Sequence, residues 1–93
     1  MSTQQTGRMV AVAALEANPV AHLTAEQADM LRSTQADLSF EDIGMDSMAR
    51  MELSIWLELE HGIELSEREI QEVGSVSRLA ALLDGRLRAP GGS

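Results

Sequence analysis

Residues 47–60 carry the strongest helical pattern in the chain, and this pattern decides the fold class. Apolar residues recur there at intervals of three and four, as they do along a helix. One apolar line runs through Leu53 and Leu57. A second line consists of Met48, Met51, Ile55 and Leu59. Together the two lines cover more than half of the helix circumference, which is wider than burial in a small bundle requires.

Two shorter helices are expected before this segment. The first covers residues 8–17 and stops at Asn18, because the residue before a proline avoids the helical region. The second begins at Thr24, which has capping-box spacing with Gln27. It lies in the connection 18–36, whose structure the sequence leaves open.

Two more helices are expected after the long one. Gly62 is placed to end the long helix in a left-handed conformation. Ser66 and Glu69 have capping-box spacing at the start of a short helix, and Ser75 is placed to cap a last helix over 76–87. No segment shows the alternation of apolar and polar residues that is typical of a half-buried strand.

The core has to be aliphatic, because Trp56 and Phe40 are the only aromatic residues. Leu, Ile, Val, Ala and Met therefore do the packing, which favours helices over a β-sandwich. We predict an all-α fold, a small four-helix bundle with one extra short helix in the long loop after the first helix. The 93 residues suffice for one domain, expected over 8–88, between a disordered stretch 1–7 and a flexible tail 89–93.

Negative charge is concentrated in the middle of the chain. The net charge is −8, and residues 37–72 contain eleven Asp or Glu against two Arg. Such an acidic surface disfavours nucleic acid and anionic membranes as partners and favours basic protein surfaces. The absence of cysteine excludes disulfides and thiolate metal sites. The apolar run 9–15 is too short for a signal peptide or a membrane span, so a cytoplasmic location is expected.

An acidic loop leads into the long helix and places Ser47 at the start of that helix. Leu38, Phe40 and Ile43 are spaced to anchor this loop to the core, and Gly44 permits a tight turn. Asp and Ser are both good N-terminal caps. Ser47 therefore has a plain structural interpretation as a helix cap.

A helix start also suits a phosphate ester, because its unpaired N–H groups and positive dipole end favour an anion. The chain offers no base to activate the Ser47 hydroxyl: His22 and His61 are the only histidines, and His61 lies about four turns along the helix. Metal-ligand spacing and a glycine-rich phosphate loop are also absent from the sequence. We therefore interpret Ser47 as the recipient of chemistry done by another protein, and we expect no catalytic residue.

Residues 40–48 contain the sequence Phe-Glu-Asp-Ile-Gly-Met-Asp-Ser-Met, which closely resembles the phosphopantetheine attachment motif of acyl carrier and peptidyl carrier proteins. In that family a Gly, a hydrophobic residue, Asp, Ser and a second hydrophobic residue follow in this order. The resemblance covers about 38–84. It implies that a separate phosphopantetheinyl transferase, which uses coenzyme A and Mg²⁺, esterifies Ser47 with 4′-phosphopantetheine. It also implies that Asp46 helps to present the serine, and that the arm's thiol carries an acyl or aminoacyl thioester.

The resemblance further implies a docking surface on the long helix, apolar apart from the acidic contacts Glu52 and Glu58. The expected partner-binding residues are Met45, Met48, Met51, Glu52, Ile55, Trp56, Glu58 and Leu59. Two of these depart from the family pattern. Leu59 stands at a position that is often acidic in fatty-acid carriers, and Trp56 is large where small residues are common.

We expect a stand-alone, monomeric acyl carrier protein of polyketide or mixed biosynthesis. Its partners would be the transferase, an acyl- or aminoacyl-loading enzyme, and a downstream acyltransferase, synthase or condensation enzyme. An aminoacyl or aryl carrier of a nonribosomal peptide system remains an open alternative. A third interpretation, from another class, is an unmodified helical adaptor that binds a basic protein surface and uses Ser47 only as a cap.

Overall fold

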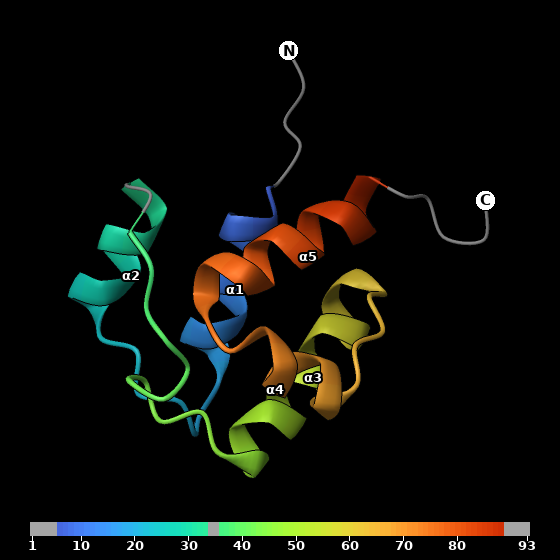
Figure 1. Cartoon of the computed structure of the whole chain (residues 1–93), viewed down its shortest axis with the longest axis horizontal. Helices are drawn as coiled ribbons and strands as arrows, with labels where there is room; N and C mark the ends of the chain where they lie inside the picture. The colour runs from blue at the N-terminus through green and yellow to red at the C-terminus, as the bar shows by residue number, and fades with distance from the viewer. Residues whose placement is uncertain (1–5, 34–35, 89–93) are drawn as a thin grey trace.

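The computed structural model describes residues 6–33 and 36–88. Its helices are α1 (Gly7–Ala17), α2 (Ala25–Ser33), α3 (Ser47–His61), α4 (Glu67–Val73) and α5 (Val76–Arg88). The predicted all-α fold is confirmed, and α2 is the predicted extra helix between the first helix and the long one (Figure 1). The described residues contain no strand, only an isolated bridge between Ser39 and Ser75. Within the same residues, no helix is long and apolar enough to cross a membrane.

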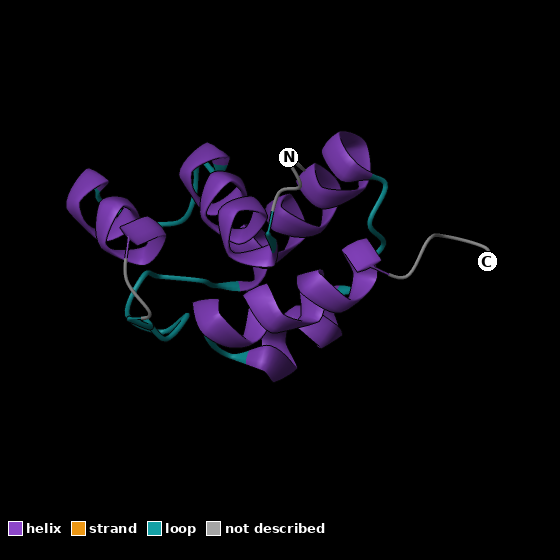
Figure 2. Ribbon diagram, turned by 90° about the horizontal axis from the view of Figure 1, so that it is seen from above, coloured by secondary structure: helices purple, strands orange, loops and turns teal. Residues whose placement is uncertain are grey.

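Helices α1 and α5 form the most extensive contact of the bundle. Helix α1 also contacts α2 and α3, while α4 contacts α3 and α5. Figure 1 shows α5 lying across α1, with α2 set apart at the edge of the bundle. The view from above in Figure 2 shows the helices running in different directions, with a loop passing between them. Helix α3 thus contacts α1 and α4 and presents its remaining surface outward.

Helices α1 and α5 approach each other closely at Gly7. A Cβ at this position would lie 2.0 Å from the carbonyl oxygen of Ala80, and the Gly7 N–H donates to a carboxylate oxygen of Asp84. Thr6 caps α1, because its Oγ1 accepts the N–H of Met9 at 3.1 Å. The predicted disorder is therefore wrong for Thr6 and Gly7, whereas the rest of that stretch and the predicted tail 89–93 lie outside the described residues.

The core is aliphatic, as predicted. Its largest fully buried side chains are Leu15, Leu31, Ile43, Leu53, Leu57, Ile70, Leu79, Leu83, Val10, Val12 and Val76. Phe40 is buried among them, whereas Trp56 is only partly buried and packs against the outside of the cluster. The ring of Trp56 lies 5.3 Å from that of His61.

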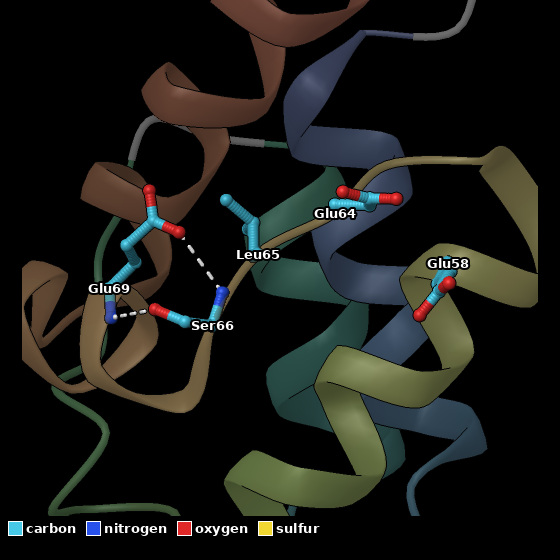
Figure 3. A pocket seen from close by; sticks show the side chains of 5 residues that line it. All are labelled: Glu58, Glu64, Leu65, Ser66 and Glu69. Carbon is cyan, nitrogen blue, oxygen red and sulfur yellow. Dashed lines mark hydrogen bonds between the residues drawn. The ribbon is translucent and has the colours of Figure 1, made fainter.

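The predicted capping boxes both form. Thr24 and Gln27 exchange backbone and side-chain hydrogen bonds of 2.9 and 3.1 Å before α2. Ser66 and Glu69 do the same before α4, at 3.0 and 3.1 Å (Figure 3). Gly62 ends α3 with a φ of 65°, as predicted. Local sequence signals therefore determine most of the helix ends.

The loop before α3 is fastened to the turn between α4 and α5. The N–H of Phe40 donates to the Gly74 carbonyl at 2.9 Å, and the N–H of Val76 donates to the Leu38 carbonyl at 3.0 Å. Phe40 and Ile43 are buried, and Leu38 is half-buried against the core. The predicted anchoring of this loop is confirmed, so the segment that leads to Ser47 has a defined path.

Candidate functional site

The N-terminal cap of α3 is Asp46, and Ser47 is the first residue of the helix. The Asp46 carboxylate accepts the N–H of Ala49 at 2.9 Å, and the Asp46 carbonyl accepts the N–H of Arg50 at 3.0 Å. Ser47 is exposed, and its hydroxyl has no hydrogen-bond partner among the described residues. The interpretation of Ser47 as the cap is therefore wrong, and its oxygen is free to react.

The first turn of α3 offers hydrogen-bond donors beside this hydroxyl. The N–H groups of Ser47 and Met48 precede the first helical hydrogen bond and have no backbone acceptor within the part of the chain that the structure describes. The positive end of the helix dipole lies at the same place. Unpaired N–H groups and this dipole suit a phosphate diester on the serine oxygen, so the donor set fits the arm that the sequence implies.

The loop before the serine is wound into tight turns. The Phe40 carbonyl accepts the N–H of Met45 at 2.9 Å, and the Gly44 carbonyl accepts the N–H of Asp46 at 2.9 Å. Gly44 has a φ of 70°, which favours glycine. The guanidinium of Arg50 reaches back from α3 and donates to the Met45 carbonyl at 3.1 Å. These contacts hold the approach to α3 in one conformation.

The second apolar line of α3 is exposed. The exposed fractions are 56% for Met48, 40% for Met51, 45% for Ile55 and 77% for Leu59. The opposite side of the helix, with Leu53 and Leu57, is fully buried. Glu52 and Glu58 flank the exposed line, the first half-buried and the second exposed. We call the four exposed apolar residues the α3 strip; they begin one residue after Ser47.

Met45 and Trp56, both expected to bind partners, are less exposed than the α3 strip. Met45 is only 7% exposed and belongs to the core, so it does not form part of an outer surface. The Met45 backbone is held on both sides, because its N–H donates to Phe40 and its carbonyl accepts from Arg50. Trp56 is half-buried and presents only part of its ring.

An open acidic depression of about 360 Å³ lies at the other end of α3. It is lined by Glu58, Glu64, Leu65, Ser66 and Glu69 (Figure 3). The hydrogen bond from the Ser66 N–H and the nearby Arg86 guanidinium lower the pKa of Glu69. Glu58 is eleven residues from Ser47, or roughly 16 Å along the helix. The depression is therefore separate from the serine, and no acidic or histidine cluster in the described residues has the arrangement of a metal site.

Comparison with known proteins yields one family and several relatives. The family described as "Phosphopantetheine attachment site" matches residues 18–83. The anthracycline acyl carrier protein DpsG of Streptomyces peucetius is 36% identical over 52 residues, which are 56% of this chain and 62% of DpsG. The chloroplastic acyl carrier protein of Brassica napus is 33% identical over 54 residues, 58% of this chain and 40% of that protein.

The siderophore peptide synthetase fer3 of Mycosarcoma maydis is also similar, with 38% identity over 52 residues, 56% of this chain and 1% of the synthetase. The matched part is thus less than two thirds of the length of each of these relatives. No solved structure matches the chain significantly.

Proposed function

Because the chain belongs to the phosphopantetheine attachment-site family, we propose that it is a carrier protein whose Ser47 hydroxyl bears the arm. Members of this family carry 4′-phosphopantetheine covalently. The observation that supports Ser47 as the attachment point is its exposed hydroxyl, which lies at the start of α3 without a hydrogen-bond partner among the described residues. The neighbouring Asp46 takes over the capping role and leaves that oxygen free.

Attachment requires one bond to form and one to break. The Ser47 oxygen bonds to the phosphorus of coenzyme A that bears the pantetheine arm. The bond from this phosphorus to the rest of the pyrophosphate breaks, adenosine 3′,5′-bisphosphate leaves, and the hydroxyl proton passes to a base of the transferase. This chain contributes the oxygen and the N–H groups of the first turn of α3. The bound arm supplies a thiol on which an acyl or aminoacyl group is carried as a thioester.

The α3 strip is the proposed docking surface for partner enzymes. Exposed methionine, isoleucine and leucine side chains gain free energy when a partner removes them from water, and the flexible methionines adapt to differently shaped partners. Glu52 and Glu58 flank them and orient a basic partner surface. We propose that the transferase, a loading enzyme and a downstream acyltransferase, synthase or condensation enzyme all bind here.

We propose an acyl cargo and a role in polyketide or mixed biosynthesis. The similarity to the anthracycline acyl carrier protein DpsG supports this choice. The similarity to the siderophore peptide synthetase fer3 supports the second candidate, an aminoacyl or aryl carrier of a nonribosomal peptide system. To separate these two candidates, the arm-bearing protein is incubated with acyl-transferring and with aminoacyl-transferring loading enzymes, and the cargo that it accepts is identified. The cytoplasmic location expected from the sequence remains a prediction.

The attachment is tested by mass spectrometry of the protein after incubation with coenzyme A, Mg²⁺ and a broad-specificity phosphopantetheinyl transferase. The expected result is a gain of one phosphopantetheine, which Ser47→Ala abolishes. Ser54→Ala is the matched control, because it removes another serine of the same helix and leaves the first turn intact. Failure of several transferases to modify the folded protein would sink the proposal and leave the adaptor, which binds a basic protein without modification.

A further inference from the structure

Asn18 is the one buried polar side chain among the described residues, with 7% of its surface exposed. It lies at the end of α1, and its side-chain amide donates to the carbonyl of Ala49 in the first turn of α3 at 2.8 Å. Its side-chain oxygen accepts the N–H groups of Val20 and Ala21 at 2.9 and 3.3 Å. A single side chain thus ties the start of α3 to the turn that follows α1.

The same turn delivers His22 to the loop before Ser47. The His22 N–H donates to the Ile43 carbonyl at 2.8 Å. The His22 ring lies against Gly44, so closely that a Cβ there would be 2.5 Å from the ring carbon Cδ2. The segment 18–22 therefore contacts the chain on both sides of the serine.

We propose that Asn18 and His22 are positioning residues for the modification of Ser47, an inference that rests on the function proposed above. Their contacts bracket the serine: Ile43 and Gly44 precede it by four and three residues, and Ala49 follows it by two. The clasp, defined as Asn18 and His22 with these contacts, belongs to neither the loop nor α3. It is supplied by a separate element, so it restrains the two relative to the rest of the bundle.

Removing the Asn18 side chain would weaken the link between the turn after α1 and the start of α3. An Ala49 carbonyl without Asn18 keeps its place in α3 but loses a buried hydrogen bond, and Val20 and Ala21 lose their acceptor. The turn 18–22 then keeps the contacts of His22 with Ile43 and Gly44 but loses its side-chain link to α3, so it restrains the serine segment less. Transfer to a serine needs its oxygen in a narrow range of positions, and small misplacements reduce rates strongly. The clasp therefore acts on the rate of modification through the mobility of the serine segment.

The test compares Asn18→Ala and His22→Ala with Ser54→Ala. Ser54, in the middle of α3, donates a side-chain hydrogen bond of 2.6 Å to the carbonyl of Leu65, which lies in the loop after that helix. The control therefore loses a similar side-chain-to-backbone contact without touching the serine segment. Two quantities are measured on the folded variants: the initial rate of phosphopantetheine transfer at limiting carrier concentration, and amide hydrogen exchange of each backbone N–H.

For Asn18→Ala we expect the transfer rate to fall roughly 10-fold or more, the effect of displacing a reacting group. His22→Ala keeps the backbone bond to Ile43 and should give a smaller decrease of several-fold. Exchange should accelerate in both variants at Met45, Ala49 and Arg50, with no change in the amides of α5. Ser54→Ala should retain the wild-type transfer rate and the wild-type exchange near Ser47.

Transfer at the wild-type rate and unchanged exchange around Ser47 in the folded variants would overturn the clasp. If Asn18→Ala does not fold, His22→Ala decides, because His22 is exposed and its loss leaves the core intact. Failure of the proposed function has a different readout: the wild-type protein itself takes up no phosphopantetheine. The exchange measurement then still decides whether Asn18 and His22 restrain the serine segment.

Discussion

The imidazole of His22 lies directly on the backbone of Gly44. A methyl carbon at Gly44 would come within 2.5 Å of Cδ2 and 3.5 Å of Cγ of that ring. Gly44 also has a φ of 70°, which L side chains rarely adopt. Two independent constraints, one from the local backbone and one from a residue 22 positions earlier, therefore require glycine three residues before the serine.

Gly44→Ala should destabilise the fold by about 1–3 kcal/mol, since it combines backbone strain with the contact to His22. The two causes are separable in a double-mutant cycle with His22→Ala. Removing the ring eliminates only the contact, so Gly44→Ala should cost about 1 kcal/mol less in that background. Urea unfolding followed by the fluorescence of Trp56, the single tryptophan, measures all four proteins. Additive costs would mean that the ring moves aside freely.

Asp46→Ala should mainly reduce the stability of the fold, whereas Ser47→Ala should mainly prevent its modification. Loss of the Asp46 cap should lower the free energy of unfolding by about 1 kcal/mol. Ser47→Ala should change it by less than about 0.5 kcal/mol, because the hydroxyl is exposed and bonds to nothing in the described structure. Yet Ser47→Ala should abolish phosphopantetheine transfer completely. Thermal unfolding measures the stability, and intact mass measures the modification. A loss of stability in Ser47→Ala equal to that in Asp46→Ala would contradict the assignment of Asp46 as the cap.

The local features of this fold were predictable from the sequence because short-range signals determine them. A capping box needs only two residues three positions apart, and Thr24 with Gln27 or Ser66 with Glu69 satisfies it without the rest of the chain. The left-handed conformation of Gly62 is equally local. The exposure of the α3 strip followed from counting more apolar positions than a small bundle can cover.

The predictions from sequence failed for residues whose environment depends on distant segments of the chain. Asp46 and Ser47 are both good caps, and the choice between them depends on how the preceding loop is held. Met45 is expected among the partner-binding residues, but the structure buries its side chain in the core. The contacts of Asn18 and His22 cross 31 and about 21 positions of sequence, and periodicity carries no signal of such pairs. The pair Asn18-Pro19 predicts the end of α1 but not what the Asn18 side chain contacts.

Low pH should weaken the contact between the loop 36–46 and α5, because it protonates the Asp37 carboxylate that links them. Partial burial raises the pKa of this carboxyl, but hydrogen bonds from the N–H groups of Ser77 and Leu38 and from the Ser75 hydroxyl outweigh it, so the net pKa lies below its usual value. A carboxyl with a lowered folded pKa stabilises the fold above its unfolded pKa, near 4, and loses this contribution as the pH falls further.

Asp37→Asn should therefore make the free energy of unfolding less dependent on pH below about 4, while reducing it at pH 7 by no more than about 1 kcal/mol, because the side chain is largely exposed. Urea unfolding at neutral and acidic pH checks this. Asp29→Asn is the control: this exposed carboxyl forms an ion pair with Arg32 on α2, away from the junction. An equal pH dependence in Asp37→Asn and the wild type would contradict the role of Asp37.

The α3 strip should matter for partners and not for folding. Met48→Ala should change the free energy of unfolding by less than about 0.5 kcal/mol, because 56% of its side chain is already in water. Leu53→Ala, on the buried side of the same helix, should cost about 2–5 kcal/mol.

If partner enzymes bind the strip, Met48→Ala should raise the carrier concentration needed for half-maximal transfer several-fold and leave the maximal rate nearly unchanged, since it removes contact area and not the reacting oxygen. Titration of the carrier against a fixed amount of transferase measures both values. A lower maximal rate with an unchanged half-saturating concentration would instead place Met48 among the residues that position Ser47, and would move the docking surface away from this strip.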